Sequence, residues 1–227
     1  DPGYGPDRLV NRVLFPDARA NGSTLTEGSG PAPLVERLDW VDPLLAELPM
    51  PRGTMRLTRS LTSGLARAVG GDPNLFWGIG DRGPNLKPQA ALERYGLTAL
   101  APHAETDGAK VMPLPEAGPA LALFRIKGRA VTLEAVHPLR TPAGASLSGL
   151  PLPLPEQESE PALALNGATL GTHLDGADTE GVAARRDRKL WIAEEYGPSL
   201  LLVSADGVVE ARHVPIGTAH HFTGSSI

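Results

Sequence analysis

Carboxylate side chains recur around strand-like segments of this chain. Asp178 and Glu180 precede one apolar segment, Glu194 and Glu195 follow it, and Asp81 follows another apolar segment far upstream. Several carboxylates held a few ångströms apart repel one another, so such a cluster persists when a bound cation or a basic side chain compensates it. Carboxylate oxygens suit a hard cation such as calcium. The pattern predicts a calcium-type site wherever the fold brings these segments together.

The two acid-bearing segments belong to an internal repeat. "GLARAVGGDPNLFWGIGDRGP" (64–84) aligns with "GVAARRDRKLWIAEEYGP" (181–198), and the turn is three residues longer in the first copy. The shared pattern is Trp, three residues, an acid, one residue and Gly-Pro, at the end of a hairpin. The matched positions are Gly64 with Gly181, Trp77 with Trp191, Asp81 with Glu195, and Gly83-Pro84 with Gly197-Pro198.

The repeat favours one all-β architecture over two others. Many short strands must hide their edges, which they do by closing into a barrel, pairing into a sandwich or repeating radially as propeller blades. A hairpin repeated within one chain is typical of the third solution. We therefore predict a β-propeller of four-stranded antiparallel blades, in which equivalent strand ends gather the acids at one mouth of the central channel. A sandwich-type carbohydrate-binding domain does not predict this repeat.

The remaining segments predict further strands and few helices. The chain has 26 Gly and 23 Pro among 227 residues, which favours loops and turns. Residues 138–160 are rich in Pro, Ser and Glu, which predicts an exposed loop. A helical turn is expected at Ala90–Tyr95 and a short helix at 35–48, interrupted by Pro43. The expected strands are Leu9–Phe15, 54–61, 64–69, 74–80, a hairpin over 120–136, and four strands between 181 and 214.

Composition excludes several classes of function. The net charge is −5 and no dense basic stripe is present, so a nucleic-acid partner is not expected. The absence of cysteine excludes disulfides, thiolate metal sites and a cysteine nucleophile. No apolar stretch approaches 18 residues, so no membrane span is expected.

Three motifs of the chain resemble the phytase-like family, also described as having esterase-like activity of phytase. They are "FWGIGDRGPN" (76–85), "DTEGVAA" (178–184) and "LWIAEEYGPSLLLVSADG" (190–207), and "PLRTPAGASLSGLP" (138–151) is similar to the segment between them. One departure is Glu194, where the family typically has Asp. The resemblance implies a propeller of about six blades, a periplasmic or secreted setting, and a hydrolase acting on phosphate or carboxylate esters.

The resemblance and the repeat together assign candidate roles. Calcium is expected as the cofactor, by analogy with the calcium-dependent phytases that share the propeller fold. Glu194 alternates to the other face of its strand, so it is the least favoured of the acids. The expected metal ligands are Asp81, Asp178, Glu180 and Glu195; the expected catalytic residues are Asp81, Arg82, Glu180 and Glu195; and the expected substrate-binding residues are Arg82, Asn85 and Tyr196.

Other chemistries are less well supported by the sequence. A lone His173 in a loop is more often neither base nor ligand, and Ser225-Ser226 lack the frame of a nucleophile elbow. The main alternative is a non-catalytic propeller module whose acids hold a structural ion. No sequence feature separates that module from an enzyme.

The strand count predicts an incomplete ring. A four-stranded blade takes roughly 40–50 residues, and about ten or eleven strands make fewer than three blades. Residues 1–227 are therefore expected to be the N-terminal part of a single propeller domain. Its C-terminal remainder would be a partner, either a polypeptide separated by cleavage after Phe222 or a segment missing from this chain.

Overall fold

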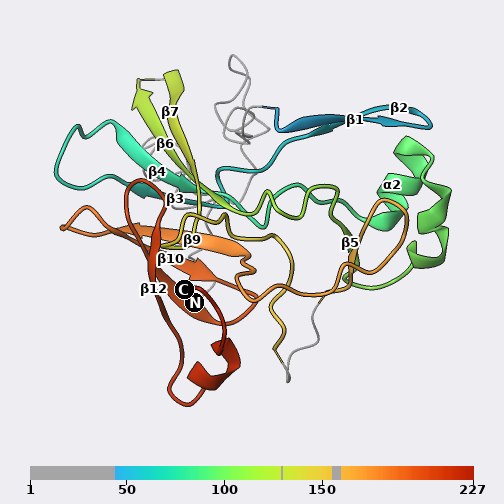
Figure 1. Cartoon of the computed structure of the whole chain (residues 1–227). Helices are drawn as coiled ribbons and strands as arrows, with labels where there is room; N and C mark the ends of the chain where they lie inside the picture. Colours follow the sequence, from blue (N-terminus) through green and yellow to red (C-terminus); the bar gives the residue numbers. More distant parts are fainter. Residues whose placement is uncertain (1–43, 129, 155–159) are drawn as a thin grey trace, which may run out of the picture.

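Two four-stranded antiparallel sheets dominate the protein (Figure 1). The structure is a computed structural model that describes residues 44–128, 130–154 and 160–227. Both sheets are meanders, in which neighbours along the chain are neighbours in the sheet, apart from the insertion between the second and third strands of the first sheet. The first sheet contains β3 (Gly64–Arg67), β4 (Leu75–Ile79), β6 (Ala120–Lys127) and β7 (Ala130–Pro138); the second contains β9 (Thr179–Ala184), β10 (Leu190–Glu194), β11 (Ser199–Val203) and β12 (Val209–His213).

A smaller unit lies beside the sheets. Its helix α2 (Pro88–Tyr95) begins with proline at its first turn and ends at Gly96, whose left-handed φ of 70° terminates the helix. Ala91 packs with residues from the elements that follow, forming a separate small core. The other elements are the hairpin of β1 (Ala46–Met50) and β2 (Gly53–Leu57), the 3-10 helices η3 (Thr98–His103) and η4 (Ala219–Phe222), and the parallel pair β5 (Lys110–Val111) and β8 (Ala162–Leu163).

The repeat is reproduced in the strand register. Gly64 faces Ile79 and Ala66 faces Trp77 across β3 and β4. At the matched positions of β9 and β10, Gly181 faces Ala193 and Ala183 faces Trp191. The two copies therefore form the same pair of strands, each opening a four-stranded sheet, as the sequence predicts.

The matched glycines are also where the two sheets touch. A Cβ atom added to Gly64 would lie 2.9 Å from the carbonyl oxygen of Glu180 and 2.9 Å from the Cα atom of Gly181. Thr179 then donates a hydrogen bond from its hydroxyl to the carbonyl oxygen of Gly80. These backbone-level contacts leave no space for side chains and fix the end of β4 against the start of β9.

The main core fills the space between the sheets. Ile79 and Leu121 of the first sheet belong to one buried cluster with Leu190, Ile192 and Leu201 of the second. The first sheet also packs a second cluster, which includes Leu61 and Phe124, against its other side. The first sheet is thus covered on both faces, and the inner face of the second sheet is the one it buries against the first.

The two matched tryptophans occupy different environments. Trp77 packs against the main core. Trp191 instead has its ring 5.0 Å from the Arg185 guanidinium and 5.0 Å from the His213 ring. The buried face of β10 carries Leu190, Ile192 and Glu194, so the alternation along this strand directs Trp191 to the opposite face.

The segment 138–160 differs from the exposed loop predicted for it. Beyond the end of β7 its described residues have no regular secondary structure, as expected. Leu139, Leu147 and Leu152 are nevertheless buried, and the first two belong to the main core. Composition concealed these leucines because they are spaced among Pro, Gly and Ser.

Other secondary-structure predictions have mixed outcomes. The helical turn at Ala90–Tyr95 and the hairpin over 120–136 are confirmed, as α2 and as β6 with β7. The helix expected at 35–48 is wrong for Ala46–Leu48, which lie in β1. It is also wrong for Leu44 and Leu45, which have no regular secondary structure, whereas residues 35–43 and the strand at Leu9–Phe15 fall outside the described residues. The fold is mostly β with four-stranded antiparallel sheets, as predicted, and the described residues form no closed ring, so the propeller stays a prediction.

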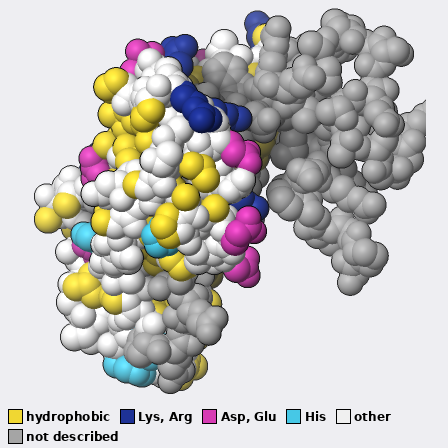
Figure 2. All heavy atoms as spheres, turned by 90° about the vertical axis from the view of Figure 1, so that its right-hand side faces the viewer, with side chains coloured by type: hydrophobic (Ala, Val, Ile, Leu, Met, Phe, Trp, Pro, Cys, Tyr) yellow, Lys and Arg dark blue, Asp and Glu magenta, His cyan; other side chains and the backbone are white. Residues whose placement is uncertain are grey.

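Charged side chains of both signs are mixed on the surface. On the face seen in Figure 2, basic and acidic side chains are interspersed with hydrophobic ones and form no continuous basic stripe. Among the helices that the structure describes, none has the length and apolar character to cross a membrane.

The contact between the sheets predicts the effect of enlarging Gly64. Gly64→Ala should lower the free energy of unfolding by about 1–3 kcal/mol, because a new methyl group meets backbone atoms that cannot rotate away. Gly71→Ala is the matched control, since a Cβ there meets nothing within 4 Å. Urea denaturation measures both; equal stability of the two variants would contradict the tight contact.

Candidate functional site

Three carboxylates meet where β4 ends and β9 begins. Asp81 follows β4, Asp178 immediately precedes β9, and Glu180 lies within it. One carboxylate oxygen from each lies within 4.8 Å of the other two. The pairing of β9 with β10 shifts between Ala193 and Glu194, which leaves Glu180 unpaired in a bulge. Bulges redirect side chains next to functional sites, and here the bulge is at one of the three acids.

The guanidinium of Arg82 lies among these acids. It forms ion pairs with Asp178 and with Glu160, and its Nε atom lies 3.1 Å from Oδ1 of Asp81. Only 11% of the Arg82 side chain is exposed. The guanidinium also lies 5.1 Å from the centre of the Tyr196 ring, a distance typical of a cation–π contact. Arg82 is thus the internal counter-charge of the cluster.

Tyr196 is buried and fixed by its hydroxyl group. That hydroxyl donates a 3.0 Å hydrogen bond to the carbonyl oxygen of Gly149. The ring therefore forms a rigid wall beside Arg82 and restricts the orientations that the guanidinium can adopt.

Asp178 is the most deeply buried carboxylate of the cluster. Its side chain is fully buried, and neither carboxylate oxygen accepts a hydrogen bond of ordinary geometry from the described residues. Burial, together with the adjacent Asp81, raises the pKa of Asp178 to about 9. Burial alone would raise the pKa of Asp81 too, but its interactions with Asp178 and Arg82 lower it. Asp81 and Asp178 therefore titrate as a coupled pair rather than as two independent carboxyl groups.

Glu180 and Glu195 form the exposed side of the cluster. Both side chains are exposed. Burial and the charges of Asp81 and Glu195 raise the pKa of Glu180, so Glu195 is near enough to act on it. Glu195 is not one of the three acids whose oxygens meet. The structure thus brings Asp81, Asp178 and Glu180 together and leaves Glu195 at the rim.

Asn85 contributes to the turn that follows Arg82. Its amide donates a 3.0 Å hydrogen bond to the carbonyl oxygen of Gly83 and stabilises the turn after Arg82. Gly83 has a left-handed φ of 98°, and a Cβ there would lie 1.9 Å from the carbonyl oxygen of Ala117. Asn85 therefore helps to hold the turn that positions Arg82.

Glu194, the acid least favoured as a ligand by the sequence, holds the backbone of the site in place. Its carboxylate accepts hydrogen bonds from the backbone N–H groups of Asp178, Tyr196 and Gly197, at 3.2, 2.8 and 3.0 Å. It also pairs with Arg212 at 3.2 Å, and the two side chains are 0% and 2% exposed. Burial raises the pKa of Glu194, against the opposing effect of Arg212 and these hydrogen bonds. Glu194 thus holds both Asp178 and Tyr196 through their backbones.

Two members of this network, Glu160 and Arg212, were not predicted from the sequence. Glu160 lies in a segment whose composition predicts only an exposed loop, and Arg212 reads as an ordinary strand residue. The face alternation that separates Glu194 from Glu195 was the available signal for Arg212, because a buried acid needs a buried counter-charge.

The histidine and serine candidates serve local structure. His173 accepts a 3.1 Å hydrogen bond from the backbone N–H of Asp175 through its Nδ1 atom. Ser225 donates a 2.8 Å hydrogen bond to Asp175. Among the residues that the structure describes, no serine is hydrogen-bonded to a histidine side chain.

The buried Glu194–Arg212 pair predicts a large effect of one neutralising change. Glu194→Gln should lower the free energy of unfolding by about 3–5 kcal/mol, because it leaves Arg212 buried without a counter-charge. Glu195→Gln, the adjacent exposed carboxylate, should change it by less than about 0.5 kcal/mol. Thermal and urea unfolding in the presence of a chelator give both values; a tolerant Glu194→Gln variant would show that the pair is not important for the fold.

Comparison with known proteins identifies a family. Residues 61–224 match the model of the phytase-like family, described as esterase-like activity of phytase. No curated protein and no solved structure gives a match. The matched range contains both copies of the repeat and every acid of the cluster. The chain belongs to the phytase-like family.

Proposed function

We propose that this chain is part of a β-propeller hydrolase that acts on phosphate or carboxylate esters, with a calcium-type cation held at the cluster of Asp81, Asp178 and Glu180. The observation that carries the proposal is the convergence of three carboxylates within 4.8 Å beside a buried arginine. Family membership supports a hydrolase-like function. A periplasmic or secreted setting follows from the same resemblance.

The donor set fits a hard cation. All three residues offer carboxylate oxygens, which calcium prefers. Oδ2 of Asp178 is paired with Arg82, whereas its buried Oδ1 accepts no hydrogen bond from the described residues and is available to a cation. Ionised Asp178 is unfavourable in this burial, and a divalent cation would offset that cost. When bound, calcium supplies a Lewis acid that activates water and neutralises charge on the ester oxygens.

Arg82 would bind the anionic group of the substrate, and the exposed acids would bind water. The Arg82 guanidinium is a planar donor fork that matches the oxygens of a phosphate or carboxylate group. Tyr196 and Asp81 hold this fork in one orientation. Glu180 and Glu195, exposed at the rim, are placed to orient a water molecule or to accept a proton from it.

The propeller proposal is supported by the way the sheets pack. Two sheets with equivalent register pack face to face at their first strands, as neighbouring blades do. The outer face of the second sheet carries Trp191 opposite Leu202 and Ala193 opposite Leu200, which is exposed. A further blade would cover this apolar face. The proposed partner is therefore the C-terminal remainder of the propeller.

One observation favours a second candidate function, a binding module with a structural ion. Arg82 is already engaged by Asp81, Asp178 and Glu160, so its positive charge is compensated within the chain. In such a module the cation would only complete this network, and the propeller would bind its ligand without turning it over.

Calcium titration and hydrolysis assays separate these functions. Asp81→Asn and Glu180→Gln should weaken calcium binding, measured by calorimetry, by at least about tenfold because each removes one charged ligand. Both should reduce calcium-dependent hydrolysis of p-nitrophenyl phosphate or p-nitrophenyl acetate in parallel. Glu105→Gln, an exposed acid outside the cluster, is the matched control.

Each outcome has a clear meaning. Parallel loss of calcium binding and turnover supports the enzyme. Calcium binding without turnover on either ester supports the binding module. Unchanged calcium affinity in both variants would overturn the assignment of the cation site itself.

A further inference from the structure

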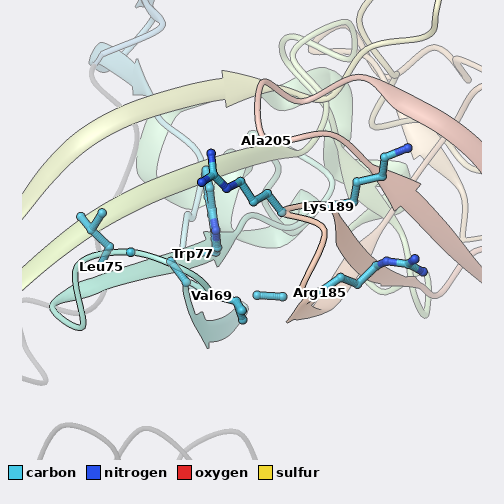
Figure 3. Close-up of a pocket in the computed structure, with 10 residues that line it drawn as sticks. Val69, Leu75, Trp77, Arg185, Lys189 and Ala205 are labelled. Atoms are coloured by element: carbon cyan, nitrogen blue, oxygen red, sulfur yellow. The ribbon is translucent and has the colours of Figure 1, made fainter.

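A second concave site lies between the hairpin turns of the two sheets. It has a volume of about 140 Å³ and lies at the far ends of the repeated hairpins, away from the acids. Val69 of the β3–β4 turn and Leu75 and Trp77 of β4 line one side, and the β9–β10 turn contributes Arg185, Arg188 and Lys189. In Figure 3, Leu75, Val69 and Trp77 lie on one side of the pocket, and Arg185 and Lys189 lie on the other.

The floor of the pocket is apolar and open to solvent. Val69 is 39% exposed, and Leu75 and Trp77 are half-buried. Sites for drug-sized ligands span roughly 300–1,000 Å³, so this pocket has room only for a much smaller molecule. A flat, single-ring body would cover the exposed apolar surface.

The charge of the pocket has one sign. Among its described lining residues three are basic and none is acidic. Arg185 pairs with Asp187 and lies over the Trp191 ring, and Lys189 pairs with Glu210. In Figure 3 the ends of these two side chains are directed away from Trp77. They contribute mainly their aliphatic stems to the wall.

Arg188 is the lining residue whose positive charge is available to an anionic ligand. Its guanidinium has no ion pair or side-chain hydrogen bond with the described residues, although it lines the pocket. Its backbone has a left-handed φ of 66°, the one such value at a described residue other than glycine. Gly or Asn adopts this turn position more easily than Arg does. The position thus carries a charged side chain at a conformational cost.

We propose that this pocket binds a small organic carboxylate with a flat apolar body. The apolar body would lie on Val69, Leu75 and Trp77, and the carboxylate would accept hydrogen bonds from the Arg188 fork. The pocket is separate from the acid cluster, and its ligand is of opposite charge to the cation proposed there.

Benzoate is the probe, and the indole N–H signal of Trp77 in ¹⁵N NMR spectra is the readout. Benzoate should shift that signal saturably, with a dissociation constant in the millimolar range and a value about tenfold weaker for benzyl alcohol, which lacks the charge. Acetate, which lacks the ring, should also bind more weakly. The indole signal of Trp191, which does not line the pocket and adjoins it only through Arg185, should shift less than that of Trp77.

Variants at the turn test the role of Arg188 directly. Arg188→Gly suits the left-handed backbone, so it should unfold at the same or a higher temperature than wild type while binding benzoate about tenfold more weakly. Arg188→Lys, which keeps the charge without the fork, should be intermediate. Arg186→Ala removes a neighbouring charge outside the pocket and should bind like wild type. Equal binding by the Arg188→Gly variant, or equal binding of benzyl alcohol and benzoate, would overturn the proposal.

Discussion

The site depends on one close approach between two sheets. Gly64 lies against the backbone of Glu180 and Gly181, and the Thr179 hydroxyl is bonded to the carbonyl oxygen of Gly80. Thr179 lies between two of the clustered acids, and Gly80 directly precedes the third. The contact that joins the sheets therefore also sets the spacing of the carboxylates. Any larger residue at Gly64 would separate the strand ends and the acids with them.

Carboxylates at this spacing repel one another, and two groups of residues stabilise them. Among the acids, Arg82 supplies a positive charge, and the raised pKa of Asp178 favours its neutral form. Beneath them, Glu194 and Arg212 form a buried pair whose backbone hydrogen bonds fix Asp178 and Tyr196. The cluster is thus held rigidly from below while its exposed rim, at Glu180 and Glu195, remains accessible. A rigid base with an accessible rim is suited to binding a ligand.

The sequence predicted the repeated hairpins and most of the residues near the acids, because both depend on local pattern. Trp, acid and Gly-Pro at matched positions are readable from one chain, and their register is reproduced in both sheets. The roles of Glu194 and Glu195 were harder to separate, since alternation gives two faces without saying which is buried. Glu160 and the core leucines Leu139 and Leu147 could not be found, because their burial results from contacts between distant segments.

A crystal structure determined with calcium, or with a lanthanide for its anomalous signal, tests whether the three carboxylates bind a cation together. It should contain one ion peak, with oxygens of Asp81, Asp178 and Glu180 at roughly 2.3–2.6 Å from it, and an Arg82 guanidinium no longer paired with Asp178. A structure at saturating calcium that has no peak beside these acids, with Arg82 still bonded to Asp178, would contradict a shared cation site.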